Sequence, residues 1–248
     1  MKLATSCICC GSKNLTHWLA ELMPFIAHRT QLDENVMTVE CRDCGAMFVD
    51  ARFSADEMAA IYTDYRGEDY IREREYFEPG YRERQAGFTG LPYIGKVEDF
   101  LRPYLGTNKR ILDWGGNDGV NTPFKNSPAD VYDPSGATVK HGQAVDKPSG
   151  FYDLIVFANV IEHVPYPAKA LKDIRRHMTD GCLLYIEVSL DDATNKKRWH
   201  EHINVFTEKA LAKLCERCGL IVMETKQLEE PPYRPYLMAC RKDEHGHL

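Results

Sequence analysis

The chain has 248 residues, enough for one large domain or for one domain and a small module. Its formal net charge of −6 gives no overall positive field that would attract nucleic acid or an anionic membrane. The longest apolar run, residues 154–161, is too short to cross a bilayer, and the first residues lack the apolar core of a signal peptide. We therefore expect a cytoplasmic protein with no nucleic-acid partner and no membrane insertion.

Two Cys-x-x-Cys-Gly knuckles lie near the N-terminus, one from Cys7 to Cys10 and one from Cys41 to Cys44. Nine cysteines without an export signal favour a metal site over a disulfide framework. Four thiolates are the ligand set of a tetrahedral structural zinc site, although chance pairing among so many cysteines is the alternative. We expect residues 1–52 to form a four-cysteine zinc ribbon, stabilised by metal because its own core is small, with Cys9 outside the ligand set.

Residues 53–106 are polar and helical in pattern, and we expect them to form a connector or lid. Tyrosines and arginines alternate between Tyr62 and Arg84. Such a segment can hold an anionic ligand and stack on a sugar face. It can equally be a solvated helical face held by Glu–Arg pairs, so its contact with cofactor, acceptor or solvent stays open.

A glycine-rich turn follows the apolar strand expected at residues 110–114, and an acidic residue, Asp133, ends the next strand. This is the layout of a nucleotide-binding α/β half, in which the backbone approaches the ligand and the carboxylate accepts ribose hydroxyls. The glycine spacing of dinucleotide-binding folds is absent, because Asn117 and Val120 stand at the second and third glycine positions. Asn tolerates a positive φ better than most residues. The residues of the turn that we expect to hold the cofactor are Asp113, Gly115, Gly116, Asn117 and Gly119.

Strands alternate with helices after residue 107, a pattern typical of an α/β fold with a parallel sheet. Further strands are expected at residues 151–159, 182–188, 220–225 and 236–240, with helices near Pro123 and at 167–178 and 208–218. The segment 134–150 has barely enough residues for a full helix and another strand, so the sheet should be trimmed there. A third Cys-x-x-Cys, from Cys215 to Cys218, lies on an amphipathic helix, and we expect it to pack in the core.

Ligands of open α/β sheets bind at the carboxyl ends of the strands. Asn159 ends the strand 151–159, and we expect it to lie beside the cofactor. His163 follows this strand, and His200, Glu201 and His202 follow the strand 182–188. A His or Glu beside a reacting group can serve as a general base, whereas a single His is more often a packed or surface side chain. The candidates, in order of preference, are His202, His163 and His200, with Glu201 as an orienting partner. Glu162 is expected to be structural.

From Cys7 to about Thr225, the order of these motifs resembles class I S-adenosylmethionine (SAM) methyltransferases with an N-terminal zinc ribbon, in particular bacterial enzymes of deoxysugars and surface glycans. The resemblance rests on both cysteine pairs, the Leu-Asp-x-Gly turn, the Glu162-His163-Val run and the His200-Glu201-His202 run before Phe206-Thr. The C-methyltransferases among these enzymes carry a Tyr where this chain has Trp199. They also carry a second large C-terminal domain, which we do not expect within residues 1–248.

The resemblance implies a Rossmann-like class I methyltransferase domain at residues 107–248, with SAM as cofactor and structural zinc. It implies methyl transfer to a hydroxyl or carbon of a nucleotide sugar or glycan, with O- and C-methylation both open. SAM carries an activated methyl group, so the enzyme mainly aligns the acceptor and removes its proton. Two alternatives stay open: another small-molecule or lipid-linked acceptor, or a non-catalytic zinc-ribbon protein with a degenerate Rossmann half, which Asn117 and the trimmed sheet favour.

Overall fold

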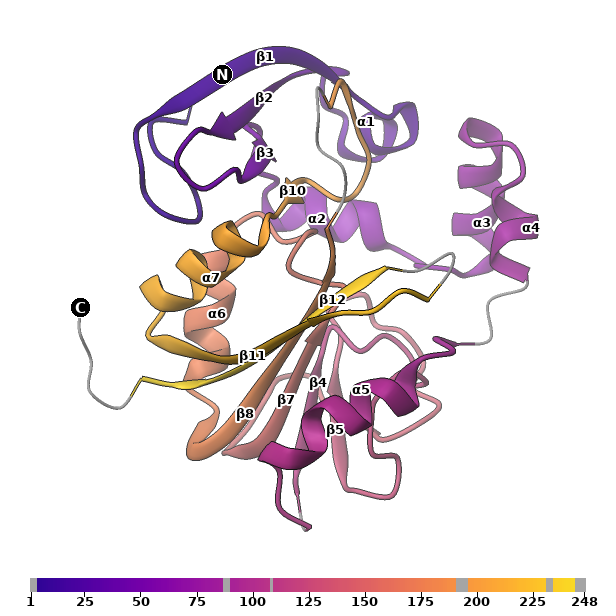
Figure 1. Ribbon diagram of the computed structural model, residues 1–248. Helices are drawn as coiled ribbons and strands as arrows, with labels where there is room; N and C mark the ends of the chain where they lie inside the picture. Colours follow the sequence, from indigo (N-terminus) through magenta and orange to yellow (C-terminus); the bar gives the residue numbers. More distant parts are fainter. Residues whose placement is uncertain (1–3, 87–89, 108, 191–195, 231–233, 244–248) are drawn as a thin grey trace.

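The computed structural model describes residues 4–86, 90–107, 109–190, 196–230 and 234–243. A seven-stranded sheet with the order β11-β12-β8-β7-β4-β5-β6 forms the centre of the molecule (Figure 1). Its strands are β4 (Ile111–Trp114), β5 (Ala129–Tyr132), β6 (Gln143–Ala144), β7 (Tyr152–Ala158), β8 (Met178–Ser189), β11 (Leu220–Gln227) and β12 (Pro235–Lys242). The expected α/β Rossmann-like sheet is confirmed.

The sheet is mixed rather than wholly parallel. Strands β4 to β8 run parallel to one another, whereas β12 is antiparallel to both β8 and β11. A short connection joins β11 to β12, and adjacent strands joined in this way run antiparallel, whereas parallel strands need a long crossover. At the opposite edge of the sheet, the last strand, β6, has only two residues. This edge is therefore trimmed, as the short segment 134–150 predicts.

The short helix expected near Pro123 is wrong. Residues 115–128, all of which are described, form turns and no helix. Asn117 and Phe124 adopt φ angles of +51° and +56°, which a right-handed helix does not allow. A loop without a helix therefore connects the glycine turn to β5.

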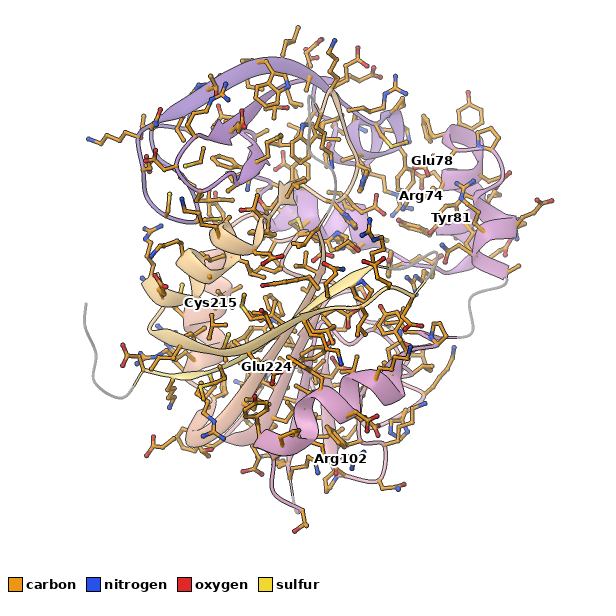
Figure 2. All side chains as sticks on the ribbon, viewed as in Figure 1. Arg74, Glu78, Tyr81, Arg102, Cys215 and Glu224 are labelled. Atoms are coloured by element: carbon orange, nitrogen blue, oxygen red, sulfur yellow. The ribbon has the colours of Figure 1, made fainter. Side chains whose placement is uncertain are left out.

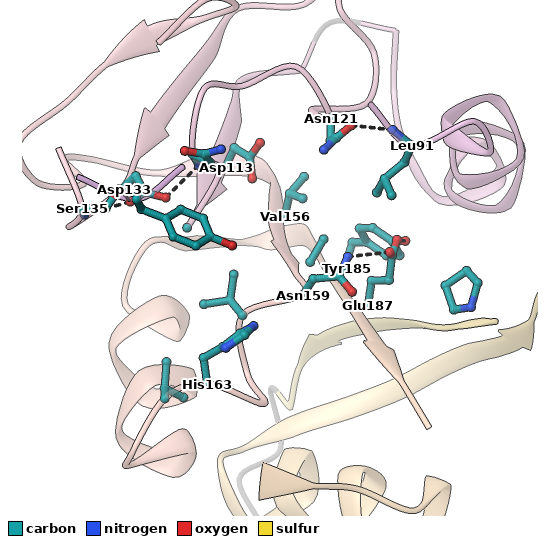
Figure 3. A pocket seen from close by; sticks show the side chains of 18 of the residues that line it. Leu91, Asp113, Asn121, Asp133, Ser135, Val156, Asn159, His163, Tyr185 and Glu187 are labelled. Carbon is teal, nitrogen blue, oxygen red and sulfur yellow. Dashed lines mark hydrogen bonds between the residues drawn. The ribbon is translucent and has the colours of Figure 1, made fainter. Parts of the chain in front are cut away.

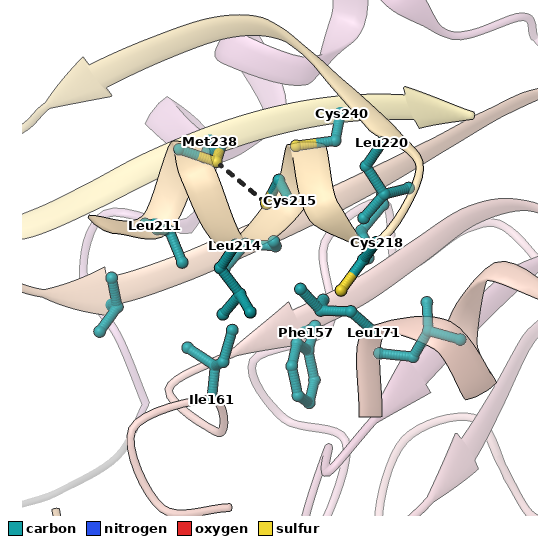
Figure 4. Packing of buried hydrophobic residues seen from close by; sticks show 14 of the residues in the cluster. Phe157, Ile161, Leu171, Leu211, Leu214, Cys215, Cys218, Leu220, Met238 and Cys240 are labelled. Carbon is teal, nitrogen blue, oxygen red and sulfur yellow. Dashed lines mark hydrogen bonds between the residues drawn. The ribbon is translucent and has the colours of Figure 1, made fainter. Parts of the chain in front are cut away.

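Helices cover both faces of the large sheet. On one face lie α6 (Pro167–Arg175) and α7 (Glu208–Arg217), and on the other lies α5 (Ile94–Leu101), followed by the 3₁₀ turn η1 (Arg102–Tyr104). Cys215 and Cys218 are buried between α7, α6 and the sheet, beside Leu214 and Met238 (Figure 4). The expectation that this cysteine pair packs in the core is confirmed.

A second sheet, with the order β10-β3-β2-β1-β9, lies beyond the carboxyl ends of the central strands (Figure 1). Its strands are β1 (Leu15–Leu22), β2 (Asn35–Cys41), β3 (Met47–Val49), β9 (Arg198–Trp199) and β10 (Asn204–Val205). The two short strands come from the chain after β8: β9 pairs with β1, and β10 pairs with β3. The N-terminal sheet therefore includes a segment from the far part of the sequence.

Four further helices are α1 (Pro24–Thr30), α2 (Ala55–Tyr62), α3 (Glu68–Phe77) and α4 (Tyr81–Ala86). Ser54 begins α2 with a capping box, in which its hydroxyl accepts from the Glu57 N–H and the Glu57 carboxylate accepts from the Ser54 N–H. In the described part of the chain, no helix has both the length and the apolar character needed to span a bilayer.

Candidate active site

A cavity of about 410 Å³ lies at the carboxyl ends of β4, β5, β7 and β8 (Figure 3). The connector encloses it from the other side with the end of α2, the turn that follows it and the start of α5. The cofactor residues expected from the sequence that line the cavity are Asp113, Gly115, Gly116, Asn117, Asp133 and Asn159.

Three positions of the glycine turn have different steric requirements. Gly115 has a φ of +80°, and a Cβ there would lie 2.5 Å from a methyl carbon of Val160. Asn117 occupies a left-handed conformation, as its tolerance of positive φ predicts. Gly119 is not among the described residues that line the cavity, and a Cβ there would lie 2.0 Å from the carbonyl oxygen of His141. It permits close backbone packing behind the turn.

The carboxylate of Asp133 connects this turn to the end of β5. Its Oδ2 accepts the Asn117 N–H at 2.7 Å, and its Oδ1 accepts the backbone N–H of Ser135 at 2.9 Å and the Ser135 hydroxyl at 2.6 Å. Ribose hydroxyls approaching this carboxylate would compete with the Ser135 hydroxyl, which is the most easily displaced of the three donors.

Asp113 is buried at the base of the turn, where Thr122 donates its hydroxyl to Oδ2 at 2.5 Å. Burial raises the pKa of Asp113 to about 6, and the negative charge of Asp133 adds to the rise although the Thr122 hydrogen bond opposes it. A cation placed beside this carboxyl would favour its ionised form.

Glu187 is a buried acid of the cavity that the sequence motifs did not identify. Its Oε1 accepts from the Tyr93 hydroxyl at 2.8 Å and from Asn159 Nδ2 at 2.7 Å, and its Oε2 accepts from the Tyr185 hydroxyl. Its backbone carbonyl also accepts the Asn159 N–H at 2.8 Å, holding Asn159 at a φ of +54°. An acidic residue within the apolar run of β8 was the signal available in the sequence.

Three histidines from two segments meet at the edge of the cavity. The His163 and His202 rings lie 4.5 Å apart between centroids, and the His202 and His200 rings lie at the same distance. His163 lines the cavity, whereas His200 and His202 are not among its described lining residues. The nearest ligand-type atoms of Glu162, His163 and His202 lie within 4.8 Å of one another.

His163 is held by two contacts on one ring nitrogen. Its Nδ1 lies 2.9 Å from the Tyr62 hydroxyl and 3.2 Å from the carbonyl oxygen of Glu201. Burial, reinforced by the neighbouring His202, lowers the pKa of His163 to about 3. The imidazole is therefore neutral near pH 7, and Nε2 is the nitrogen that remains for an acceptor proton.

Glu201 forms a bidentate ion pair with Arg74 of α3, at 2.9 Å and 3.0 Å. Arg74 also donates to Glu78 and lies 4.5 Å from the centroid of the Tyr81 ring (Figure 2). Burial alone would raise the pKa of Glu201, but the charge and hydrogen bonds of Arg74 outweigh it and bring the pKa to about 2. The expected orienting role of Glu201 is compatible with this fixed position.

The four knuckle cysteines lie together beside the second, smaller sheet (the small sheet), where β2 ends and β3 begins. The Sγ atoms of Cys7 and Cys44 are 3.6 Å apart, those of Cys10 and Cys41 are 3.5 Å apart, and all four lie within 4.8 Å of one another. Zn–S bonds of about 2.3 Å in a tetrahedron require S–S separations near these values. The four thiols therefore fit a zinc ion.

The knuckles dock on α7 of the large domain. Thr207 donates its hydroxyl to the carbonyl of Cys44 at 2.6 Å, and the same hydroxyl accepts the Ala210 N–H as the N-cap of α7. Arg217 donates to the carbonyl of Cys9 at 2.6 Å. Both ends of α7 thus contact the cysteine site.

Residues 84–225 match the family model described as "Methyltransferase domain". No curated protein sequence matches the chain at a significant level. These residues include the glycine turn, Asp133, Asn159 and the histidines, so the family match covers most of the cavity described above.

Several solved methyltransferases have a similar structure. The 1,6-didemethyltoxoflavin-N1-methyltransferase of Burkholderia thailandensis, bound to 1,6-didemethyltoxoflavin and S-adenosylhomocysteine (SAH), has a TM-score of 0.56 and 18% identity, over 82% of this chain and 97% of that chain. The magnesium protoporphyrin IX methyltransferase of Synechocystis PCC 6803, bound to SAM, has a TM-score of 0.50 and 13% identity, over 75% and 97% of the two chains. At such low identity, these similarities establish a shared fold.

Proposed function

We propose that this chain, which belongs to the methyltransferase domain family and is a SAM-dependent methyltransferase, methylates a hydroxyl group or a carbon of a saccharide, such as a nucleotide sugar or a glycan. The names of the similar structures specify a toxoflavin precursor and a magnesium porphyrin as acceptors, which differ widely. The acceptor class must therefore be argued from the side chains of this cavity.

The donor side of the cavity is the part formed by the glycine turn and by β5. In our proposal, the backbone of residues 115–117 holds the methionine part of SAM, and Asp133 holds the ribose in exchange for its Ser135 contact. Asn159, fixed by Glu187, lies beside the donor centre. SAM supplies a methyl group already activated as part of a sulfonium, so these residues act by positioning.

The acceptor side begins at His163. The observation that carries the proposal is this neutral, half-buried imidazole, which lines the same cavity as the donor residues and is fixed through Nδ1. In this proposal, Nε2 of His163 takes the proton of the acceptor, while His202 packs against the His163 ring with the two centroids 4.5 Å apart. We therefore place His163 ahead of His202, which the sequence alone ranked first, and His200 last, with Glu201 orienting the turn.

Aromatic and polar side chains around His163 support a saccharide. The rings of Tyr62, Tyr65 and Tyr93 line the cavity, and such rings pack on the apolar face of a sugar. Glu187 and Ser189 add hydrogen-bonding groups for hydroxyls.

A second candidate acceptor class is supported by the opposite wall. Leu91, Ile94, Val97 and Pro235 also line the cavity, and none of these side chains can hydrogen-bond a hydroxyl. They favour a less polar small molecule, or the lipid-linked form of an acceptor.

We further propose that Cys7, Cys10, Cys41 and Cys44 bind one structural zinc ion in a ribbon of residues 1–52, followed by a connector of residues 53–106 and the SAM-binding domain of residues 107–248. Four thiolates leave no open coordination position, so the ion supplies stability and takes no part in methyl transfer.

The experiment that tests the proposed function is transfer of tritium from methyl-labelled SAM to panels of nucleotide sugars, glycans and apolar small molecules. Labelling of a sugar that is lost in His163→Ala, while the variant still binds SAH, is the expected result. Labelling only of apolar acceptors would replace the saccharide by the second candidate, and SAH binding with no transfer to any nucleotide sugar or glycan would refute the saccharide.

A further inference from the structure

Two cavities meet beside the glycine turn. The second, of about 590 Å³, lies between the connector helices and residues 135–140, next to the cavity of the candidate active site. Five residues line both: Tyr65, Arg66, Asn117, Asn121 and Ser135. Two of these residues, Asn117 and Ser135, are hydrogen-bonded to the carboxylate of Asp133, so the junction adjoins the donor side of the site.

Arg66 is the only Arg or Lys among the described residues that line the first cavity. Three acids, Asp113, Asp133 and Glu187, line the same cavity, so the charged side chains of the lining other than Arg66 are acidic. Its carbon lies 5.1 Å from the centroid of the Tyr65 ring, which supports the planar group on one side.

An unusual turn places Arg66 at the junction. Asp64 and Arg66 both adopt positive φ angles, +54° and +61°, which are unfavourable for residues other than glycine. The carboxylate of Asp64 stabilises this turn by accepting the N–H groups of Asp69 and Tyr70 at the start of α3. Strained backbone of this kind is common at ligand clamps, and here it presents Tyr65 and Arg66 together.

Asn121 supplies a second donor at the junction. Its Oδ1 accepts the backbone N–H of Leu91 at 2.9 Å, which fixes the orientation of the amide (Figure 3). The amide Nδ2 is then the group of this side chain that is available to donate to a ligand. A guanidinium and an amide N–H₂ side by side fit a carboxylate, which offers two oxygens as acceptors.

We propose that Arg66 and Asn121 bind the α-carboxylate of the amino-acid part of SAM. The inference rests on the proposed function, which places the methionine part of the donor along residues 115–117. An anionic group of the acceptor is the competing ligand, but the acceptor side lies around His163 and Glu187, whereas the junction adjoins Asn117 and Ser135. The connector turn thus contributes a cofactor contact, which the Tyr/Arg pattern of the sequence left undecided.

The test compares SAH with S-adenosyl-3-thiopropylamine, which is SAH without its carboxylate, by calorimetry on the full chain. The wild-type protein should bind SAH about 10- to 100-fold more tightly, as expected for charge-assisted hydrogen bonds. Arg66→Ala should weaken SAH binding by about the same factor and leave the affinity for the amine within about threefold. Arg66→Lys should fall between wild type and Arg66→Ala for SAH, because it keeps the charge and loses the fork.

Two further variants sharpen the result. Asn121→Asp keeps an oxygen for the Leu91 N–H but replaces the amide donor by an anion, so it should weaken SAH binding and spare the amine. Arg72→Ala removes an exposed arginine that pairs with Asp69 on α3, outside both cavities, and should bind both ligands as the wild type does.

The possible outcomes separate a failure of the proposed function from a failure of the carboxylate inference. No SAH binding by a folded wild-type protein would refute the donor site of the proposed function itself. Normal SAH binding by Arg66→Ala would overturn only the carboxylate inference, and if the KM for the acceptor then rose, Arg66 would belong to the acceptor. An equal loss of affinity for SAH and for the amine would also overturn the inference, because Arg66 would then shape the cavity without contacting the carboxylate.

Discussion

Arg74 of α3 and Glu201 form a bidentate ion pair that joins the connector to the turn between β9 and β10. The turn carries His200 and His202, and the carbonyl of Glu201 contacts Nδ1 of His163. The ion pair therefore fixes, at one point, a helix of the connector and the segment that holds the histidines.

Replacing Arg74 by Ala should destabilise the protein strongly. The substitution leaves the Glu201 carboxylate buried without its cation, which typically costs about 3–5 kcal/mol. We expect a large fall in the melting temperature and, in the fraction that stays folded, a fall in kcat larger than the change in SAH affinity. The control is Arg82→Ala, which removes an exposed pair with Glu68 and should leave the melting temperature near that of wild type. Equal melting temperatures of the two variants would contradict the importance of the ion pair.

Asp113 should make the stability of the unliganded protein depend on pH. Its pKa is about 6 in the folded state against 3.8 as the ordinary value, so the folded protein binds the proton more tightly than the unfolded chain does. The contribution of this group to stability is therefore fully present below pH 3.8 and is lost as the pH rises to about 6, by about 3 kcal/mol in total.

The measurement is chemical denaturation of wild type and Asp113→Asn between pH 4 and pH 7. The Asn variant lacks the titrating group, so its free energy of unfolding should rise relative to that of wild type across this window. A difference that does not change with pH would show that Asp113 has an ordinary pKa.

Glu187 should be a positioning residue for Asn159. Glu187→Gln preserves the shape but replaces one acceptor oxygen by an N–H₂ donor, whereas Tyr93, Tyr185 and Asn159 all donate to this carboxylate. One mismatched buried hydrogen bond costs about 1–3 kcal/mol. We expect kcat to fall about 10-fold or more while the affinity for SAH changes little. Glu187→Asp, which retains the charge on a shorter stem, should recover part of kcat, and a kcat of Glu187→Gln equal to that of wild type would refute the role.

The sequence predicted the elements that have a strong local pattern. The apolar run of β7 and the amphipathic α7, with Thr207 as N-cap and Gly219 beyond its end, agree with their expected positions. Strands β9 and β10 were not predicted, because two-residue strands have no period and their partners, β1 and β3, lie far away in the sequence. Tertiary pairing alone defines them.

The candidate site was predicted to a similar extent. Asp133 and Asn159 follow from the rule that ligands bind at strand ends, and both line the cavity. Arg66 could not be separated from the other arginines of the connector, since its position depends on the left-handed turn at Asp64 and Arg66. The preference for His163 over His202 likewise depends on the packing of β9 and β10 against the small sheet.

The cysteine site should support the histidine turn at a distance. The knuckles hold the ends of β2 and β3, β3 pairs with β10, and His202 lies just before β10. We expect one zinc ion per chain, measured by atomic emission on purified protein, and we expect Cys41→Ser to lose it, because structural zinc sites need all four thiolates.

Loss of the metal should lower the melting temperature and kcat together, while SAH, which we place on the large sheet, should still bind to the folded fraction. Cys218→Ala is the matched control: it removes a buried cysteine of the α7 core and should keep the zinc and most of the activity, at a stability loss of about 1 kcal/mol. If Cys41→Ser retained full turnover after losing its metal, the cysteine site and the histidine turn would be independent, and the small sheet would owe its order to β-pairing and to the contacts of Thr207 and Arg217 alone.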